Sequence, residues 1–311
     1  MPKIELSKIE PESGRTFLRE VFIAAFFLPA PIDETVSAID QAFELFLAMV
    51  PNDCFRWASV SATSEEWKPF GKTTLARCKA QLRREAAANR KLTYFELADG
   101  EIGGSVPRYG ITVLGGKLRS NFPGERTLVQ LSFPIDAAMM ERADAFVARL
   151  AEIAAVLPVD SGYGSPAIQW SEFNRDQAIG YTRKIIAKHP GYDVNQNTIG
   201  RKRLGSKIRG ARWLTFLGSE ILERLGGREA LRKKLPTTFE FISTRSCLVI
   251  RAGNLPELGD TVAKLDTPHL RELAAVLEPA TAFDEVALLG SLADWDKNAL
   301  RKWERRFLDP A

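Results

Sequence analysis

The residues most suggestive of chemistry are Asp53, Glu66 and Lys68, which loosely follow the Asp…Glu-x-Lys spacing of metal-dependent nucleases. In such a site two carboxylates hold the metal and the lysine steadies the attacking water. That chemistry requires Glu66 and Lys68 on one strand beside Asp53, with both side chains on the same face. Residues 61–68 are polar and precede Pro69, a pattern typical of a loop. A metal-dependent nuclease using these three residues is therefore kept only as the alternative to a protein without catalysis.

Other catalytic motifs are incomplete. The segment from Phe70 to Thr74 resembles the end of a phosphate-binding loop, but Glu66 occupies the position where that loop needs a glycine. The two histidines, His189 and His269, adjoin prolines and have no further ligand at a metal-binding spacing. The chain also lacks the Gly-x-Ser-x-Gly turn that presents a serine nucleophile. The sequence therefore predicts no catalytic set, no cofactor and no metal site.

Positive charge is concentrated in one segment. The formal net charge is +4, but residues 201–234 hold eleven lysines and arginines against three glutamates, which leaves about −4 for the rest of the chain. The segment could clamp phosphates as a nucleic-acid-binding module, yet it lacks interleaved aromatic residues and any known docking motif. We expect instead a surface loop that pairs with acids in this chain or in a protein partner. The candidate contacts are Arg201, Lys202, Arg203, Lys207 and Arg209.

Composition is that of an ordinary globular protein. Apolar residues make up 45% and charged residues 26% of the 311 positions, enough to bury a sizeable core. The longest apolar stretch, residues 21–31, is shorter than the roughly 18 residues that a membrane span needs, and no secretory signal is visible. Cys54, Cys78 and Cys247 are odd in number and widely spaced, which favours free thiols in a reducing compartment. We therefore expect a cytoplasmic protein with no membrane partner.

Apolar periodicity predicts the helices that must form the framework. Residues 32–50, 136–157 and 291–307 each carry one apolar stripe at helical spacing. We expect burial of Ile39, Phe43 and Phe46 in the first helix and of Trp295 and Trp303 in the last. Further helices are predicted at residues 72–89, 175–188, 213–225 and 267–277.

Runs rich in β-branched and aromatic residues predict strands at 15–28, 55–60, 92–97, 109–114 and 127–133, with a hairpin formed by 238–243 and 247–252. Residues 162–170 are predicted to form a glycine-rich turn leading into a short strand. Several strands follow one another without a helix between them, so the predicted fold class is α+β, with an antiparallel or mixed sheet packed against amphipathic helices. The length allows a single domain over 1–311 or two packed halves with a weak boundary near 158–165.

Three blocks in the second half carry a family resemblance. The first runs from Leu204 through Arg212 and Trp213 to Leu231, the second covers residues 248–260, and the third is the closing Trp…Arg-Phe pattern of residues 303–307. Together they resemble the type VI immunity family for VRR-type nuclease effectors. The N-terminal half resembles that family only in the order of its elements.

The resemblance implies a cytoplasmic immunity protein that binds and neutralises a cognate type VI secretion effector, a nuclease toxin. It implies a protein partner, the effector; the sequence patterns above already argue against a membrane partner and make nucleic acid the less favoured alternative. Inhibitors of nucleases are often acidic, because they compete with nucleic acid for a basic cleft, whereas this chain is basic overall. Either the toxin is acidic where it meets the basic segment, or the contact uses the more acidic remainder of the chain.

Overall fold

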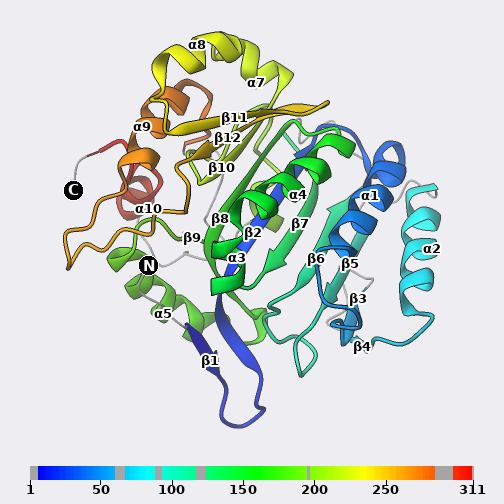
Figure 1. The fold of residues 1–311 in the computed structure, drawn as a ribbon. Helices are drawn as coiled ribbons and strands as arrows, with labels where there is room; N and C mark the ends of the chain where they lie inside the picture. The colour runs from blue at the N-terminus through cyan, green and yellow to red at the C-terminus, as the bar shows by residue number, and fades with distance from the viewer. Residues whose placement is uncertain are drawn as a thin grey trace.

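A single twelve-stranded sheet runs through the computed structural model, which describes residues 6–59, 67–87, 93–116, 124–194, 197–283 and 297–309 (Figure 1). Its strands are β1 (Ser7–Ile9), β2 (Thr16–Leu28), β3 (Trp57–Ser59), β4 (Lys68–Pro69), β5 (Thr93–Ala98), β6 (Gly110–Gly115), β7 (Thr127–Phe133), β8 (Ser161–Trp170), β9 (Asp193–Val194), β10 (Leu214–Gly218), β11 (Phe239–Ser243) and β12 (Cys247–Ala252). The strand order is β11-β12-β10-β8-β2-β7-β6-β5-β3-β4, with β1 beside β2 and β9 beside β8.

The helices are distributed over both faces of this sheet. They are α1 (Ile32–Leu47), α2 (Thr74–Ala87), α3 (Ala137–Glu141), α4 (Ala143–Val156), α5 (Arg175–Lys188), α6 (Asn197–Gly200), α7 (Ser219–Arg224), α8 (Gly227–Lys234), α9 (Pro268–Leu277) and α10 (Lys297–Glu304), with 3₁₀ turns η1 (Glu172–Asn174) and η2 (Glu278–Ala280). Among the described strands, β8 and β9 pair in parallel and the other pairs are antiparallel. The predicted α+β class is confirmed.

Strands β2 and β8 form the centre of the sheet. They pair antiparallel from Leu18 opposite Trp170 to Phe27 opposite Ser161, and β2 is buried throughout from Val21 to Leu28. Because successive side chains of a strand point to opposite faces, one set of β2 side chains faces α1 and α4, on what we call the front face. The alternate set faces the rear, so both faces of these central strands are covered by protein.

Helices α1, α3 and α4 cover the front face, as Figure 1 shows. The predicted stripe of α1 is confirmed, because Ile39, Phe43 and Phe46 are all buried. The ring of Phe46 lies edge-on to that of Phe133 on β7, with 5.5 Å between their centroids. Such edge-to-face pairs add to the stabilisation from burying apolar area.

The rear face is covered by a mixture of helices and irregular segments. Helices α5 and α10 pack against β2 and β8 near one end of these strands, while α7, α8 and α9 pack against β10, β11 and β12. Between these groups, Leu204 and Ala282, which lie outside the helices, pack on the rear side chains of β2. Because an irregular segment cannot satisfy its own backbone groups as a helix does, this region must find its hydrogen-bond partners elsewhere in the chain.

The helix predicted at residues 213–225 is wrong. Residues Leu214–Gly218 form β10, which pairs with β8 on one side and β12 on the other, and only Ser219–Arg224 are helical. All five residues of β10 are buried, so the strand is apolar on both faces and has no period-2 alternation. An apolar run of this kind cannot be told from a buried helix by periodicity alone.

The strand at residues 162–170 is longer than predicted, because β8 begins at Ser161 and contains the glycines. A Cβ atom at Gly164 would lie 2.9 Å from the ring of Phe22, and one at Gly162 would lie 2.6 Å from the carbonyl oxygen of Ala25. Glycine inside a strand often marks such a close approach. The glycines are therefore a requirement of packing and do not form a turn.

Two predicted helices differ in extent. The helix predicted at residues 136–157 is interrupted at Arg142, which separates α3 from α4. Of the helix predicted at 291–307, Ser291 and Trp295 lie outside the described residues, whereas Trp303 and Phe307 are buried as expected. Within the described part of the chain, no helix is long and apolar enough to cross a bilayer.

We predict that Phe46→Ala lowers the free energy of unfolding by about 3–5 kcal/mol, because the lost ring leaves a cavity between α1 and β7. Urea unfolding followed by circular dichroism measures the change. The matched control is Ser37→Ala on the exposed side of α1, which should stay within about 0.5 kcal/mol of the wild type. Equal losses in the two variants would contradict the packing described for the front face.

Candidate functional site

The basic segment begins as a turn that lies directly on residues 124–126. The backbone N–H of Arg126 donates to the carbonyl oxygen of Arg201 (2.9 Å), and that of Gly205 donates to the carbonyl of Gly124 (3.0 Å). A Cβ atom at Gly124 would lie 3.0 Å from the backbone of Arg203, so a glycine permits this approach. The turn is therefore fixed to the sheet on the N-terminal side of β7.

Arg201 is buried, contrary to the expectation of an exposed contact residue. Its side chain is 2% exposed, donates to the carbonyl oxygen of Arg126 (2.8 Å) and forms an ion pair with Glu125 (3.0 Å). Next to it, Arg126 pairs with Asp160 at 2.7 Å, and both of these side chains are also buried. The expected pairing of the basic segment with acids of the same chain is confirmed for Arg201. Of the other candidates, Lys202 and Arg203 are exposed and Lys207 is half-buried.

Asp193 is the centre of a second buried network on the rear face. It is fully buried in β9, and Arg212, itself 4% exposed, donates to its Oδ1 at 2.8 Å. Burial by itself would raise the pKa of Asp193, but Arg212, Arg209 and Arg306 lower it to about 2. The carboxylate is therefore ionised at neutral pH, as its position among three guanidinium groups requires.

Arg209 is joined to the sheet through Asn197. Its Nη1 donates to Asn197 Oδ1 at 2.6 Å, and the amide of Asn197 donates to Gln130 Oε1 at 2.7 Å. The guanidinium groups of Arg209 and Arg212 lie over the ring of Tyr163, 5.7 and 5.5 Å from its centroid. Burial, followed by the nearby Asp193, raises the pKa of the Tyr163 hydroxyl above its ordinary value. Arg209 is therefore also engaged in contacts within the protein and is not a free positive charge at the edge of a binding surface.

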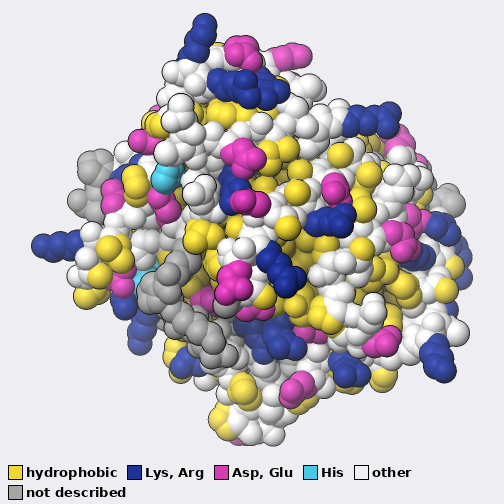
Figure 2. All heavy atoms as spheres, in the orientation of Figure 1, with side chains coloured by type: hydrophobic (Ala, Val, Ile, Leu, Met, Phe, Trp, Pro, Cys, Tyr) yellow, Lys and Arg dark blue, Asp and Glu magenta, His cyan; other side chains and the backbone are white. Residues whose placement is uncertain are grey.

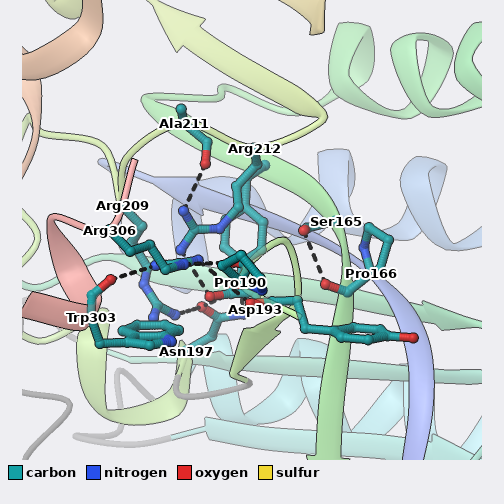
Figure 3. A network of polar contacts seen from close by, with 12 residues as sticks. Ser165, Pro166, Pro190, Asp193, Asn197, Arg209, Ala211, Arg212, Trp303 and Arg306 are labelled. Atoms are coloured by element: carbon teal, nitrogen blue, oxygen red, sulfur yellow. Dashed lines mark hydrogen bonds and ion pairs between the residues drawn. The ribbon is translucent and has the colours of Figure 1, made fainter. Parts of the chain in front are cut away.

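Arg306 enters the same network from the C-terminal end of the described chain. Its Nε donates to the carbonyl oxygen of Pro190 (2.7 Å) and its Nη1 to that of Trp303 (2.9 Å). Its guanidinium group also stacks on the ring of Trp303, 4.0 Å from the centroid. Figure 3 shows that Arg209, Arg212 and Arg306 point toward one another around Asp193. Arginine stays protonated in proteins and only donates hydrogen bonds, so this cluster is suited to binding and positioning and not to proton transfer.

The residues of the alternative nuclease site are placed only in part. Asp53 lies in the turn after α1, with a positive φ of 57°, and Lys68 lies in β4 at the end of the sheet. Glu66 lies outside the described residues. Over the described ranges, no three or more His, Cys, Asp or Glu side chains form a group that could hold a metal ion.

Both histidines have structural contacts. The Nδ1 atom of His189 lies 2.7 Å from the carbonyl oxygen of Gly259, and that of His269 lies 2.6 Å from Glu257 Oε1. These contacts fix the middle of the loop between β12 and α9 to the residue that follows α5 and to the first turn of α9. The three cysteines are free thiols in the structure, as predicted.

Asp193, Asn197, Arg212 and Arg306 were not predicted as site residues. A signal for two of them was present, because Arg212 and Arg306 both fall within the blocks that carry the family resemblance. Asp193 and Asn197 lie outside those blocks, in a polar stretch with no motif. Only the packing of the chain shows that they meet the arginines.

The fold and these blocks define the class of the protein. The chain belongs to the family described as "Type VI immunity for VRR-NUC", whose model matches residues 38–307. The fold is similar to that of the solved structure of the Pseudomonas aeruginosa T6SS protein PA0821, with a TM-score of 0.77 over 98% of this chain and 87% of that one. At 18% sequence identity this likeness concerns the fold alone. No curated protein matches the chain.

We predict that Asp193→Asn lowers the free energy of unfolding at neutral pH by about 3–5 kcal/mol, because it leaves the buried Arg212 without its counter-charge. The folded-state pKa of Asp193 lies below its ordinary value of 3.8. Its contribution to stability is therefore present above that value and is lost as the pH falls toward about 2. The difference between wild type and variant should shrink over this interval in urea unfolding. Glu152→Gln, in an exposed ion pair with Arg149, is the control and should change stability by less than about 1 kcal/mol.

Proposed function

We propose that this chain is an immunity protein that binds a type VI secretion effector, a VRR-type nuclease toxin, in the cytoplasm of the cell that produces both. The observation that carries the proposal is the family match over residues 38–307, most of the chain. The arrangement of polar groups supports a binding role. Buried arginines, both histidines and the buried carboxylates of the two networks are engaged in holding segments of the chain together.

Effector binding must then use the surface, and the exposed part of the basic segment is the first candidate. Of the five basic residues singled out from the sequence, Lys202 and Arg203 are exposed on a turn whose backbone is fixed on residues 124–126, and the half-buried Lys207 follows this turn. A surface that is rigid before binding loses less entropy when the complex forms. Positive charge there would steer an acidic region of the effector toward it. On the face seen in Figure 2, by contrast, basic and acidic side chains are interspersed with apolar ones.

A second candidate surface follows α5. The exposed large apolar side chains of the described chain lie on α5 or on segments that contact it: Ile9, Phe173, Tyr181, Leu255, Val262 and Leu265. Phe173 directly precedes the helix and Tyr181 lies on it, with the ammonium group of Lys8 over its ring at 5.1 Å. Leu255, Val262 and Leu265 lie in the loop between β12 and α9. This loop is bound to the C-terminal end of α5, where the Thr261 N–H donates to the carbonyl oxygen of Lys188 (2.8 Å). Interface cores are built from aromatic and apolar anchors of this kind.

If the chain is an immunity protein, a neighbouring gene should encode the effector, and co-expression with that gene's product tests the function. We expect the effector alone to kill the host cell and this chain to restore growth. The purified proteins should form a complex with a nanomolar dissociation constant, about −12 kcal/mol, because the inhibitor must outcompete the substrate of the toxin. Isothermal titration calorimetry measures it. Cells that die equally with and without this protein would remove the proposal.

Charge reversal tests the first surface. The triple change Lys202→Glu, Arg203→Glu and Lys207→Glu should lower the association rate, most strongly at low salt, because it removes electrostatic steering. The matched control reverses Arg232, Lys233 and Lys234, three exposed residues of α8, and should leave the rate near that of the wild type. Surface plasmon resonance at two salt concentrations provides the rates. Equal rates for both triple variants would reject the basic turn but leave the immunity function standing.

The same measurement tests the surface along α5. Val262→Asp with Leu265→Asp should raise the dissociation rate, because both side chains are more than half exposed and would be buried in the complex. Unchanged dissociation in this variant would exclude the loop from the interface.

A further inference from the structure

The three guanidinium groups around Asp193 also border a pocket. Arg209, Arg212 and Arg306 line it together with Trp303 and Glu304. Arg209 and Arg306 are half-buried, whereas Arg212 is almost completely buried. In Figure 3 these side chains come from the loop before β10 and from the turn that follows α10, and they converge from different sides.

Among the described residues, positive charge exceeds negative charge around this pocket. Three guanidinium groups face two described carboxylates, those of Asp193 and Glu304. Burial lowers the pKa of Arg306, and the nearby Arg212 and Arg209 lower it further, while Asp193 opposes them. The three hydrogen bonds described for Arg306 all go to neutral backbone carbonyls. Crowded cations with too few counter-charges are costly to desolvate, and an added anion would relieve this cost.

The arginines also retain unused hydrogen-bond donors. A guanidinium group has five N–H bonds, whereas the described contacts use one in Arg209, two in Arg212 and three in Arg306. The Nε atom of Arg212 is buried and has no hydrogen-bond partner among the described residues. Buried donors without partners are rare in native proteins, and a bound water or ion can supply the missing partner.

We propose that this pocket binds one phosphate-like oxyanion, held by Arg209, Arg212 and Arg306 together. Guanidinium groups match the oxygen geometry of phosphate through paired hydrogen bonds. A tetrahedral anion offers oxygens in three directions, as three converging arginines require, whereas a carboxylate offers two oxygens in one plane. Trp303 forms part of the pocket wall. Next to Trp303 the pocket therefore leaves room only for a small anionic group. This site is independent of effector binding.

Thermal unfolding of the full chain in increasing inorganic phosphate tests the proposal, with sodium chloride keeping the ionic strength constant. A ligand that binds the folded state raises the midpoint with the logarithm of its concentration. We expect this rise with phosphate and sulfate and not with acetate. A parallel titration with a nucleoside monophosphate distinguishes a free phosphate ion from the phosphate group of a larger molecule, since the latter should then bind more tightly.

Arg209→Gln should weaken phosphate binding by about tenfold or more, because it removes charged hydrogen bonds to the anion. Arg245→Gln makes the same change of charge at an exposed position and should bind phosphate like the wild type. Modification of the native protein with phenylglyoxal, which reacts with arginine, avoids any dependence on folding of the variant. Phosphate should protect peptides containing Arg209, Arg212 and Arg306, as read by mass spectrometry. The proposal is wrong if chloride or acetate acts as strongly as phosphate, or if protection falls elsewhere.

Discussion

The antiparallel pairing of β2 with β8 is the constraint on which the rest of the structure depends, because it places two strands at the centre of a sheet that is covered on both sides. The pairing extends from Leu18 to Phe27, and the β2 side chains along it are buried on alternate faces. On the front face, amphipathic helices meet this demand, since a helix satisfies its own backbone groups while presenting an apolar stripe. On part of the rear face the cover is irregular chain, which needs partners for its polar groups.

The arginine networks answer that need. Backbone carbonyls of distant segments accept hydrogen bonds from Arg201 and Arg306, and the carbonyl of the preceding residue accepts one from Arg212. Arg201 and Arg212 each also form an ion pair with a buried carboxylate. Arginine suits this role better than lysine, because its planar group presents several donors in fixed directions and is more weakly hydrated. Consistent with this, the two lysines of the same turn are exposed or half-buried while Arg201 and Arg212 are buried. The concentration of positive charge in this segment therefore has a structural cause in part.

The separation between buried charged residues, which hold the chain together, and exposed ones bears on how an immunity protein of this family would work. If the buried polar groups maintain the framework, specificity for an effector must come from exposed side chains on rigid supports. The basic turn and the loop beyond β12 both fit that description, since each is bound by backbone hydrogen bonds to a neighbouring segment. Surface residues can change between relatives without disturbing the core, so one framework could serve against different toxins.

The elements whose signals are local could be predicted from the sequence alone. The stripe of α1, the helix α5, the strands β5 to β7 and the hairpin of β11 and β12 follow from apolar spacing and turn residues within a few positions. The α+β class follows from the order of these elements. The strand β10 was missed because it is buried on both faces, so that no local pattern separates it from a helix. Only its pairing with β8 and β12, which are distant in the chain, decides its structure.

The exposure of the candidate site residues was likewise decided by tertiary structure. Arg201, Lys202 and Arg203 are alike in charge and adjacent in sequence. Tertiary structure buried Arg201 and left its two neighbours exposed, because only Arg201 reaches Glu125 and the carbonyl oxygen of Arg126, and an unpaired charge cannot be buried without large cost.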